Sequence, residues 1–159
     1  TLIELLITMI IASLLIGIGV PSFSYMINSN TVNVDRDTLF GSLVYARTEA
    51  VKRGETVSIC KANADLDNCD ADADWGDGWI VFEDENGDGD IDSDTILRVQ
   101  EALKRGTSLA FDGGDFVTFD GLGRSTESSG TFSFTHASGN TDFSRTITLS
   151  TTGRARKAS

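Results

Sequence analysis

The N-terminal stretch is the longest apolar run of the chain. Between Leu2 and Val20 the only charged residue is Glu4. A helix of this length, rising about 1.5 Å per residue, reaches across most of a bilayer core of about 30 Å. The pattern predicts a membrane-spanning helix over residues 1–21, followed by a head over residues 22–159.

The residues after this run change to the pattern of an amphipathic helix. Apolar residues recur every three or four positions and place one stripe on the helix: Leu39, Leu43, Ala46 and Ala50. We expect this helix to cover residues 22–53 and to end near Gly54. Its charged residues are expected to face solvent or a neighbouring protein: Asp35, Arg36, Arg47, Glu49, Lys52 and Arg53.

Residues 54–159 alternate between apolar and polar positions in short runs that are separated by Gly, Asp, Asn and Ser. Such runs predict antiparallel strands with one buried face. The predicted strands cover 56–60, 78–82, 96–100, 116–119, 131–135 and 146–149. Because the helix precedes the strands and no βαβ repeat is visible, the fold class is α+β, with an antiparallel β-sheet cradling the helix.

Charge and composition narrow the function classes. The 159 residues include 24 acidic and 13 basic ones, a net charge of −11, which argues against a protein that coats nucleic acid with its whole surface. This net charge does not exclude a small local basic site. The sole histidine, His136, is accompanied by neither a zinc-type cluster nor a nucleophile motif, so no enzyme activity is predicted.

The apolar run has three possible interpretations: a signal peptide, a plain membrane anchor, and a helix that leaves the membrane for a filament. The position of Glu4 helps to decide among them. A signal peptide begins with a basic region, whereas residues 1–4 contain neither Lys nor Arg. A carboxylate within a membrane helix costs a few kcal/mol, so it usually has a partner or a function. The alternative is that Glu4 reaches the membrane interface.

The sequence of residues 1–5, Thr-Leu-Ile-Glu-Leu, resembles the mature N-terminus of type IV pilins and type II secretion pseudopilins. In those proteins a methylated residue, which would precede Thr1, follows a processing site. The resemblance implies that Glu4 attracts the N-terminal ammonium of a neighbouring subunit, a buried pair that fixes register. It also implies roles in assembly for Thr1 and Pro21.

Pro21 follows Gly17 and Gly19, and this cluster weakens a helix. Each glycine costs about 1 kcal/mol and an interior proline about 3 kcal/mol relative to alanine. We therefore expect a kink here in the monomer. By resemblance to pilins, the nearby stretch can lose its helical form in an assembled filament.

A longer match narrows the family. Residues 45–54, followed by Val57–Cys60, Trp75, Gly78–Phe82 and a Gly-Asp-Gly loop, resemble the GspH/FimT group, which includes FimU-like minor pilins. This resemblance implies a pilin fold and a structural subunit of a type IV pilus or related filament, with a pseudopilin of type II secretion as the alternative. It favours a minor subunit, and a homopolymeric filament stays open.

The same resemblance implies partners and a location. The partners are other pilin subunits, prepilin peptidase, the pilus assembly machinery and, before assembly, the inner membrane. The chain would cross that membrane once with its head in the periplasm, and would then enter an extracellular pilus.

Cys60 and Cys69 are expected to form a disulfide. Cys60 ends a predicted strand and Cys69 lies in the loop after it. Closing a loop of about ten residues contributes roughly 2 to 3 kcal/mol in the chain-entropy model, and an exported head meets oxidising conditions. The alternative is a pair of free thiols.

An acidic loop supports two interpretations. Its oxygen-bearing residues match the first part of a calcium loop at alternate positions: Asp84, Asn86, Asp88, Asp90 and Asp92. The match departs at Thr95, where a bidentate Glu should stand. The other interpretation is a hydrophilic hairpin loop, rich in Asn, Gly and Asp because turns need them. No other cofactor is predicted.

The C-terminus concentrates positive charge on an acidic protein. Residues 153–156, Gly-Arg-Ala-Arg, resemble the motif through which FimT-like proteins of naturally transformable bacteria bind DNA. This resemblance implies, as an alternative function, a DNA-binding pilin for natural transformation with phosphate contacts from Arg154, Arg156 and Lys157. Another Gly-Arg pair occurs at residues 123–124. Alternatively, these arginines pair with acidic residues of the same or an adjacent subunit.

Overall fold

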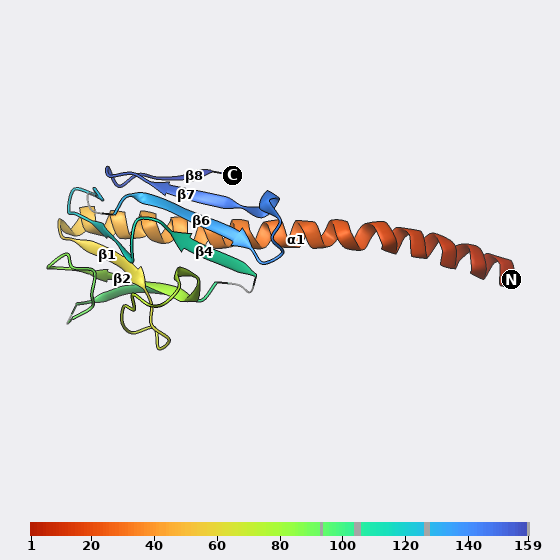
Figure 1. Cartoon of the computed structure of the whole chain (residues 1–159), viewed down its shortest axis with the longest axis horizontal. Helices are drawn as coiled ribbons and strands as arrows, with labels where there is room; N and C mark the ends of the chain where they lie inside the picture. The colour runs from red at the N-terminus through yellow and green to blue at the C-terminus, as the bar shows by residue number, and fades with distance from the viewer. Residues whose placement is uncertain (93, 104–105, 126–127, 159) are drawn as a thin grey trace.

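One long helix organises the molecule. The computed structural model describes residues 1–92, 94–103, 106–125 and 128–158, with the side chains of residues 19–21 left aside. Helix α1 (Leu2–Arg53) is continuous, and its last turn closes where Gly54, at a left-handed φ of 73°, donates its N–H to the Ala50 carbonyl. Its N-terminal half projects away from the head, and the other half lies along it (Figure 1).

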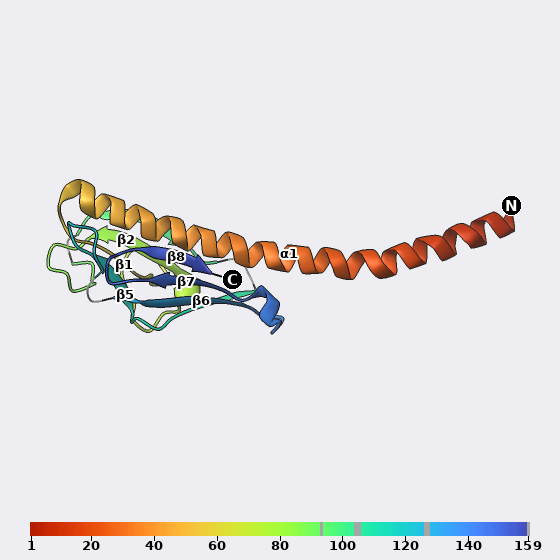
Figure 2. The same ribbon diagram turned by 90° about the horizontal axis from the view of Figure 1, so that it is seen from above.

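The expected kink is replaced by a gradual bend. The backbone of α1 stays helical through Gly17, Gly19 and Pro21, and Figure 2 shows the helix bending without a break. A proline removes one hydrogen bond of the helix, while the bonds on either side hold its two halves together. The side chain of Pro21 lies outside the described residues.

The head contains two antiparallel four-stranded sheets. The first has the order β3-β2-β1-β5 and consists of β1 (Val57–Lys61), β2 (Gly78–Glu83), β3 (Ile96–Glu101) and β5 (Phe116–Phe119). The second has the order β4-β6-β7-β8 and consists of β4 (Thr107–Phe111), β6 (Gly130–His136), β7 (Arg145–Leu149) and β8 (Ala155–Ala158). Short 3-10 helices precede β2 and β7: η1 (Trp75–Asp77) and η2 (Thr141–Phe143). Both sheets lie on the same side of α1 (Figure 2).

The predicted fold class is confirmed, with corrections in the sheets. Each predicted strand is present to within one residue at either end, but the strands divide between two sheets. Two strands were not predicted. β4 buries only Leu109 deeply, and β8, with the sequence Ala-Arg-Lys-Ala, is an edge strand without a large apolar residue. Neither strand carries the alternation on which the prediction rested.

The predicted apolar stripe forms the helical side of the core. Leu39, Leu43, Ala46 and Ala50 are all buried. They belong to one cluster with inward-facing residues of both sheets, among them Val81 and Phe134. A single core therefore joins α1 to the two sheets.

The prediction that the charged residues of the helix face outward is wrong for three of them. Asp35 and Glu49 expose only 3% and 8% of their surface. Asp35 lies within the apolar stripe, three residues after Val32 and four before Leu39, and no described residue hydrogen-bonds its Oδ2. Arg47 reaches across to the loops of the head.

Candidate functional site

The N-terminal half of α1 is uncovered by the rest of the chain. It is long and apolar enough to cross a membrane, and none of that apolar segment is buried inside the protein. Leu2 and Ile18, near its two ends, expose 82% and 74% of their surface. An apolar surface of this length needs lipid or other helices to cover it.

Glu4 lies in the first turn of this helix. Its carboxylate accepts a hydrogen bond from the nitrogen of Thr1 at 2.5 Å, in a capping-box arrangement at the start of α1. The side chain of Glu4 is 76% exposed. Two of the predicted assembly residues are therefore in contact, and the carboxylate is open to a second partner.

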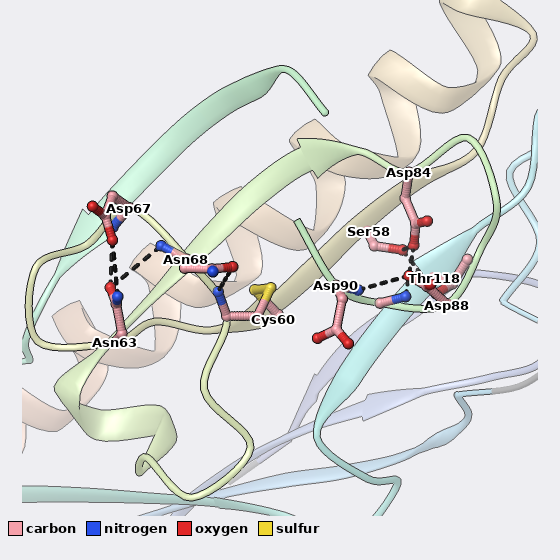
Figure 3. Close-up of a disulfide and its surroundings, with 11 residues drawn as sticks. Ser58, Cys60, Asn63, Asp67, Asn68, Asp84, Asp88, Asp90 and Thr118 are labelled. Carbon is pink, nitrogen blue, oxygen red and sulfur yellow. Dashed lines mark hydrogen bonds between the residues drawn. A yellow bond between two sulfur atoms is a disulfide. The ribbon is translucent and has the colours of Figure 1, made fainter. Parts of the chain in front are cut away.

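The predicted disulfide is confirmed. Cys60 and Cys69 are bonded, with an S–S distance of 2.01 Å (Figure 3). Asn63 organises the enclosed loop, because its Oδ1 accepts hydrogen bonds from the backbone N–H groups of Asp67 and Asn68, and its Nδ2 donates to Asp67. The loop covers the outer face of the first sheet, where Leu66 packs against the buried cluster that contains Cys60.

In the acidic loop, Asp84 is the internal anchor. It is fully buried, and it accepts a hydrogen bond from Ser58 Oγ at 2.6 Å (Figure 3). It also accepts hydrogen bonds from the Gly87 N–H (2.7 Å) and the Gly89 N–H (3.1 Å). Both carboxylate oxygens of the first predicted calcium ligand therefore already have donors. Gly89, at φ 82°, lies so close to the Phe116 ring that a Cβ there would meet it at 2.4 Å.

The remaining predicted ligands follow one another along the loop. Asn86 accepts a hydrogen bond from the Asp88 N–H, and Asp88 accepts one from the Asp90 N–H, so successive side chains stabilise successive turns. Asp92 is exposed. Among the described residues, no three His, Cys, Asp or Glu side chains gather into a group that can hold a metal ion. The calcium loop stays a prediction.

Nearly all cations of the head that the structure describes have a partner group within the protein. Lys104 and Arg105 lie outside the described residues. The partners are Asp37 for Arg36 and Lys157, Glu49 for Lys52 and Arg53, Asp115 for Lys61, Asp120 for Arg124, Asn33 for Arg145, the Tyr45 ring for Arg98, and backbone carbonyls for Arg47. Over the described part of the chain, only the guanidinium groups of Arg154 and Arg156 have no such partner.

These two arginines share one face of the second sheet. The Ser150 N–H donates to the Arg154 carbonyl, which continues the β7–β8 ladder by one residue. Ala155, between the arginines, packs against the core. Because side chains alternate along a strand, Arg154 and Arg156 point away from the core. Both are exposed.

Lys157 differs from the other two predicted DNA contacts because it faces α1. Its Nζ lies 3.0 Å from Asp37 Oδ1 and 4.5 Å from the centre of the Phe40 ring. Partial burial raises the pKa of Asp37, but hydrogen bonds from Lys157 and Arg36 outweigh it, so the pKa lies below its usual value. Lys157 thus holds the edge strand on the helix.

Gly153, the first residue of the basic motif, is required by packing. It has a φ of 73°, and a Cβ at this position would come within 1.9 Å of the Gly123 carbonyl oxygen. Arg47 joins the two turns, because its Nε donates to the Gly123 carbonyl (2.8 Å) and its Nη2 to the Thr152 carbonyl (3.3 Å). No local pattern indicates this role, since the two turns are distant from Arg47 along the chain.

The second Gly-Arg pair does not offer a free cation. The carboxylate of Asp120 accepts a hydrogen bond from the Arg124 N–H, and its other oxygen binds the Arg124 guanidinium at 2.8 Å. The backbone hydrogen bond is the main cause of the lowered pKa of Asp120. Arg124 therefore stabilises its own turn.

The chain resembles a known family in sequence and solved proteins in structure. Residues 35–153 match the family model described as type II transport protein GspH. The type IV minor pilin FimU of Pseudomonas aeruginosa is similar in structure, with a TM-score of 0.66 and 25% identity over 82% of this chain and 90% of that one. The minor pseudopilin EpsH of the Vibrio cholerae type 2 secretion system shares the fold, with a TM-score of 0.58 and 16% identity over 80% and 96%. No curated protein matches the chain in sequence.

Proposed function

This chain belongs to the family of type II transport protein GspH, and we propose that it is a type IV pilus subunit that starts in the inner membrane. It is a structural subunit of the minor pilin and pseudopilin class. In the proposed cycle, α1 spans the membrane once with the head in the periplasm. The assembly machinery then moves the subunit into an extracellular pilus, and the role involves no catalysis.

The uncovered half of α1 carries this proposal. One stripe of the helix is buried by its own head at one end, and an apolar segment at the other end is exposed to solvent on all sides. Lipid covers such a segment before assembly, and helices of other subunits replace the lipid in a filament. Similarity to FimU in both sequence and structure favours a pilus over the type II secretion pseudopilus, for which the likeness to EpsH supports the fold alone.

Glu4 is proposed to fix the register of assembly. Its carboxylate is exposed and lies at the first turn of α1, where an apolar environment strengthens attraction to the terminal ammonium of a neighbouring subunit. Prepilin peptidase, which processes pilins near this end, is a proposed partner.

The test compares Glu4→Gln with the control Glu85→Gln, which removes one exposed carboxylate from the head. We expect Glu4→Gln to remain in the membrane fraction and to be absent from sheared surface filaments. Glu85→Gln should enter filaments as the wild type does. If Glu4→Gln enters filaments at the wild-type level, register does not depend on this carboxylate.

We propose DNA binding as a second function, because the guanidinium groups of Arg154 and Arg156 are the described cations of the head without a side-chain or backbone partner. Two guanidinium groups on one exposed face can contact phosphates without reading sequence. Binding is expected to be weak and strongly dependent on salt. Replacing both arginines by Ala should abolish a gel shift at low salt.

A further inference from the structure

The sheet face next to the two arginines is unusual for this acidic protein. The strands of the second sheet contain neither Asp nor Glu, although the chain has a net charge of −11. In the first sheet, by contrast, β2 and β3 end in Glu83 and Glu101. A polyanion therefore meets least repulsion from strand residues at the second sheet.

The outward side chains of this sheet are mostly hydroxyls. In β6, Phe132 and Phe134 are buried, so the residues between them face outward. In β7, the buried residues are Ile147 and Leu149. Alternation gives the outward set: Thr131, Ser133, Thr135, Thr146 and Thr148.

Strand register joins these hydroxyls to the basic edge. Thr148 lies opposite Arg156 on one side and opposite Thr131 on the other. Neighbouring strands are about 4.8 Å apart, so a row from Arg156 through Thr148 to β6 extends about 10 Å. Beyond β6, Asp112 stands at the end of the row, and its Oδ1 accepts a hydrogen bond from the Thr131 N–H.

The face is also open. Ser133 and Thr148 are exposed, and their hydroxyls have no hydrogen-bond partner among the described residues. Figure 2 shows that α1 lies along one side of the two sheets, so it covers their inner side and not this outer face. Serine and threonine hydroxyls, like arginine, are frequent donors to phosphate oxygens in complexes with DNA.

We propose that the outer face of the second sheet, and not only its basic edge, forms a docking surface for the phosphate backbone of DNA. Arg154 and Arg156 neutralise phosphates at the edge strand, while Thr148 and Ser133 donate hydrogen bonds to phosphates farther along the face. This proposal rests on the proposed DNA-binding function and deepens it.

The test measures binding of a short fluorescent DNA duplex to the full chain in neutral detergent micelles, at low salt. Ser133→Glu and Thr148→Glu place a carboxylate on the face, and Ala64→Glu adds the same charge in the exposed disulfide loop. We expect about tenfold weaker binding for the two face variants and less than about twofold for the control. Thr148→Val, which removes only the hydroxyl, should weaken binding about two- to fivefold.

Ser133 gives the sharper result because it lies on β6, two strands away from Arg156, so its effect does not arise from neutralising that arginine. Unchanged melting temperatures show that the variants fold. If the wild type binds and the double change of Arg154 and Arg156 to Ala abolishes binding, but Ser133→Glu equals Ala64→Glu, the docking face is refuted and edge binding stands. If the wild type does not bind, DNA binding itself fails.

Discussion

The two halves of α1 have similar lengths and opposite environments. Over residues 2–18 every side chain is exposed, whereas the stripe from Val32 to Ala50 is buried against two sheets. Both halves are rich in apolar residues, but only the second has a stripe of them that is buried on one face, while Val34, Val44 and Val51 stay exposed. A helix that is apolar all round requires an apolar environment on every side, which a single head cannot supply.

The largest effect on stability is predicted from replacing one leucine in each half of α1. Leu43→Ala should lower the free energy of unfolding of the head by about 3 kcal/mol, because it leaves a cavity in the core. Leu14→Ala, on the exposed half, should leave it unchanged. Denaturant titration of both variants in micelles measures the difference. Equal destabilisation would mean that the exposed half packs on the head.

Removing the disulfide should have the next largest effect. Changing both Cys60 and Cys69 to Ser is expected to destabilise the head by roughly 2 to 3 kcal/mol, since the unfolded chain regains loop entropy. The same denaturant titration measures it. Membrane insertion should be unaffected because it depends on the other half of α1. A loss of insertion would show that the halves are not independent.

Asp84→Ala should cost about 2 kcal/mol, because buried donors of Ser58 and the loop backbone lose their acceptor. Asp92→Ala, at an exposed position of the same loop, is the matched control. Thermal unfolding compares the two. Similar melting temperatures would contradict the anchoring role of Asp84.

Calcium provides a separate test of that loop. Since both oxygens of Asp84 already accept hydrogen bonds, we expect millimolar calcium to leave the melting temperature unchanged. A rise that a chelator reverses would establish the calcium loop instead.

The smallest effect concerns the edge strand. The pKa of Asp37 is lowered in the folded state, from an unfolded value of 3.8. Its pairing with Lys157 therefore stabilises the head fully at pH values above 3.8, and this stabilisation is lost as the pH falls through the pKa of the folded state. Asp37→Asn should remove this part of the acid sensitivity. Because Asp37 is half-exposed, the change is expected to stay below about 1 kcal/mol. Unfolding curves at pH 7 and pH 3 measure it.

Local pattern predicted the parts of the fold that repeat regularly. The stripe containing Leu43 and strands such as Phe116–Phe119 have the period of their element and large apolar side chains. Strand β8 has neither, and it exists because β7 pairs with it and Lys157 contacts α1. The contacts of Arg47 depend on residues far away in sequence, which periodicity does not report. The burial of Asp35, by contrast, follows from its spacing to Val32 and Leu39 within the stripe.

The candidate sites show the same division. Cys60, Cys69 and the basic motif were visible as residue types at short spacing. The difference between Lys157 and its two arginine neighbours was not, because it follows from which face of β8 meets the helix. The hydroxyl face likewise appears only once the register of β6, β7 and β8 is known.

In the proposed filament, helices of other subunits cover the exposed half of α1. A photoreactive residue at Leu14 tests it directly, with Leu122, an exposed leucine of the head, as the control position. In sheared filaments, we predict that the probe at Leu14 cross-links to the N-terminal helix of another pilin subunit and that the probe at Leu122 does not. Absence of any pilin adduct at Leu14 in filaments that contain the chain would contradict the claim.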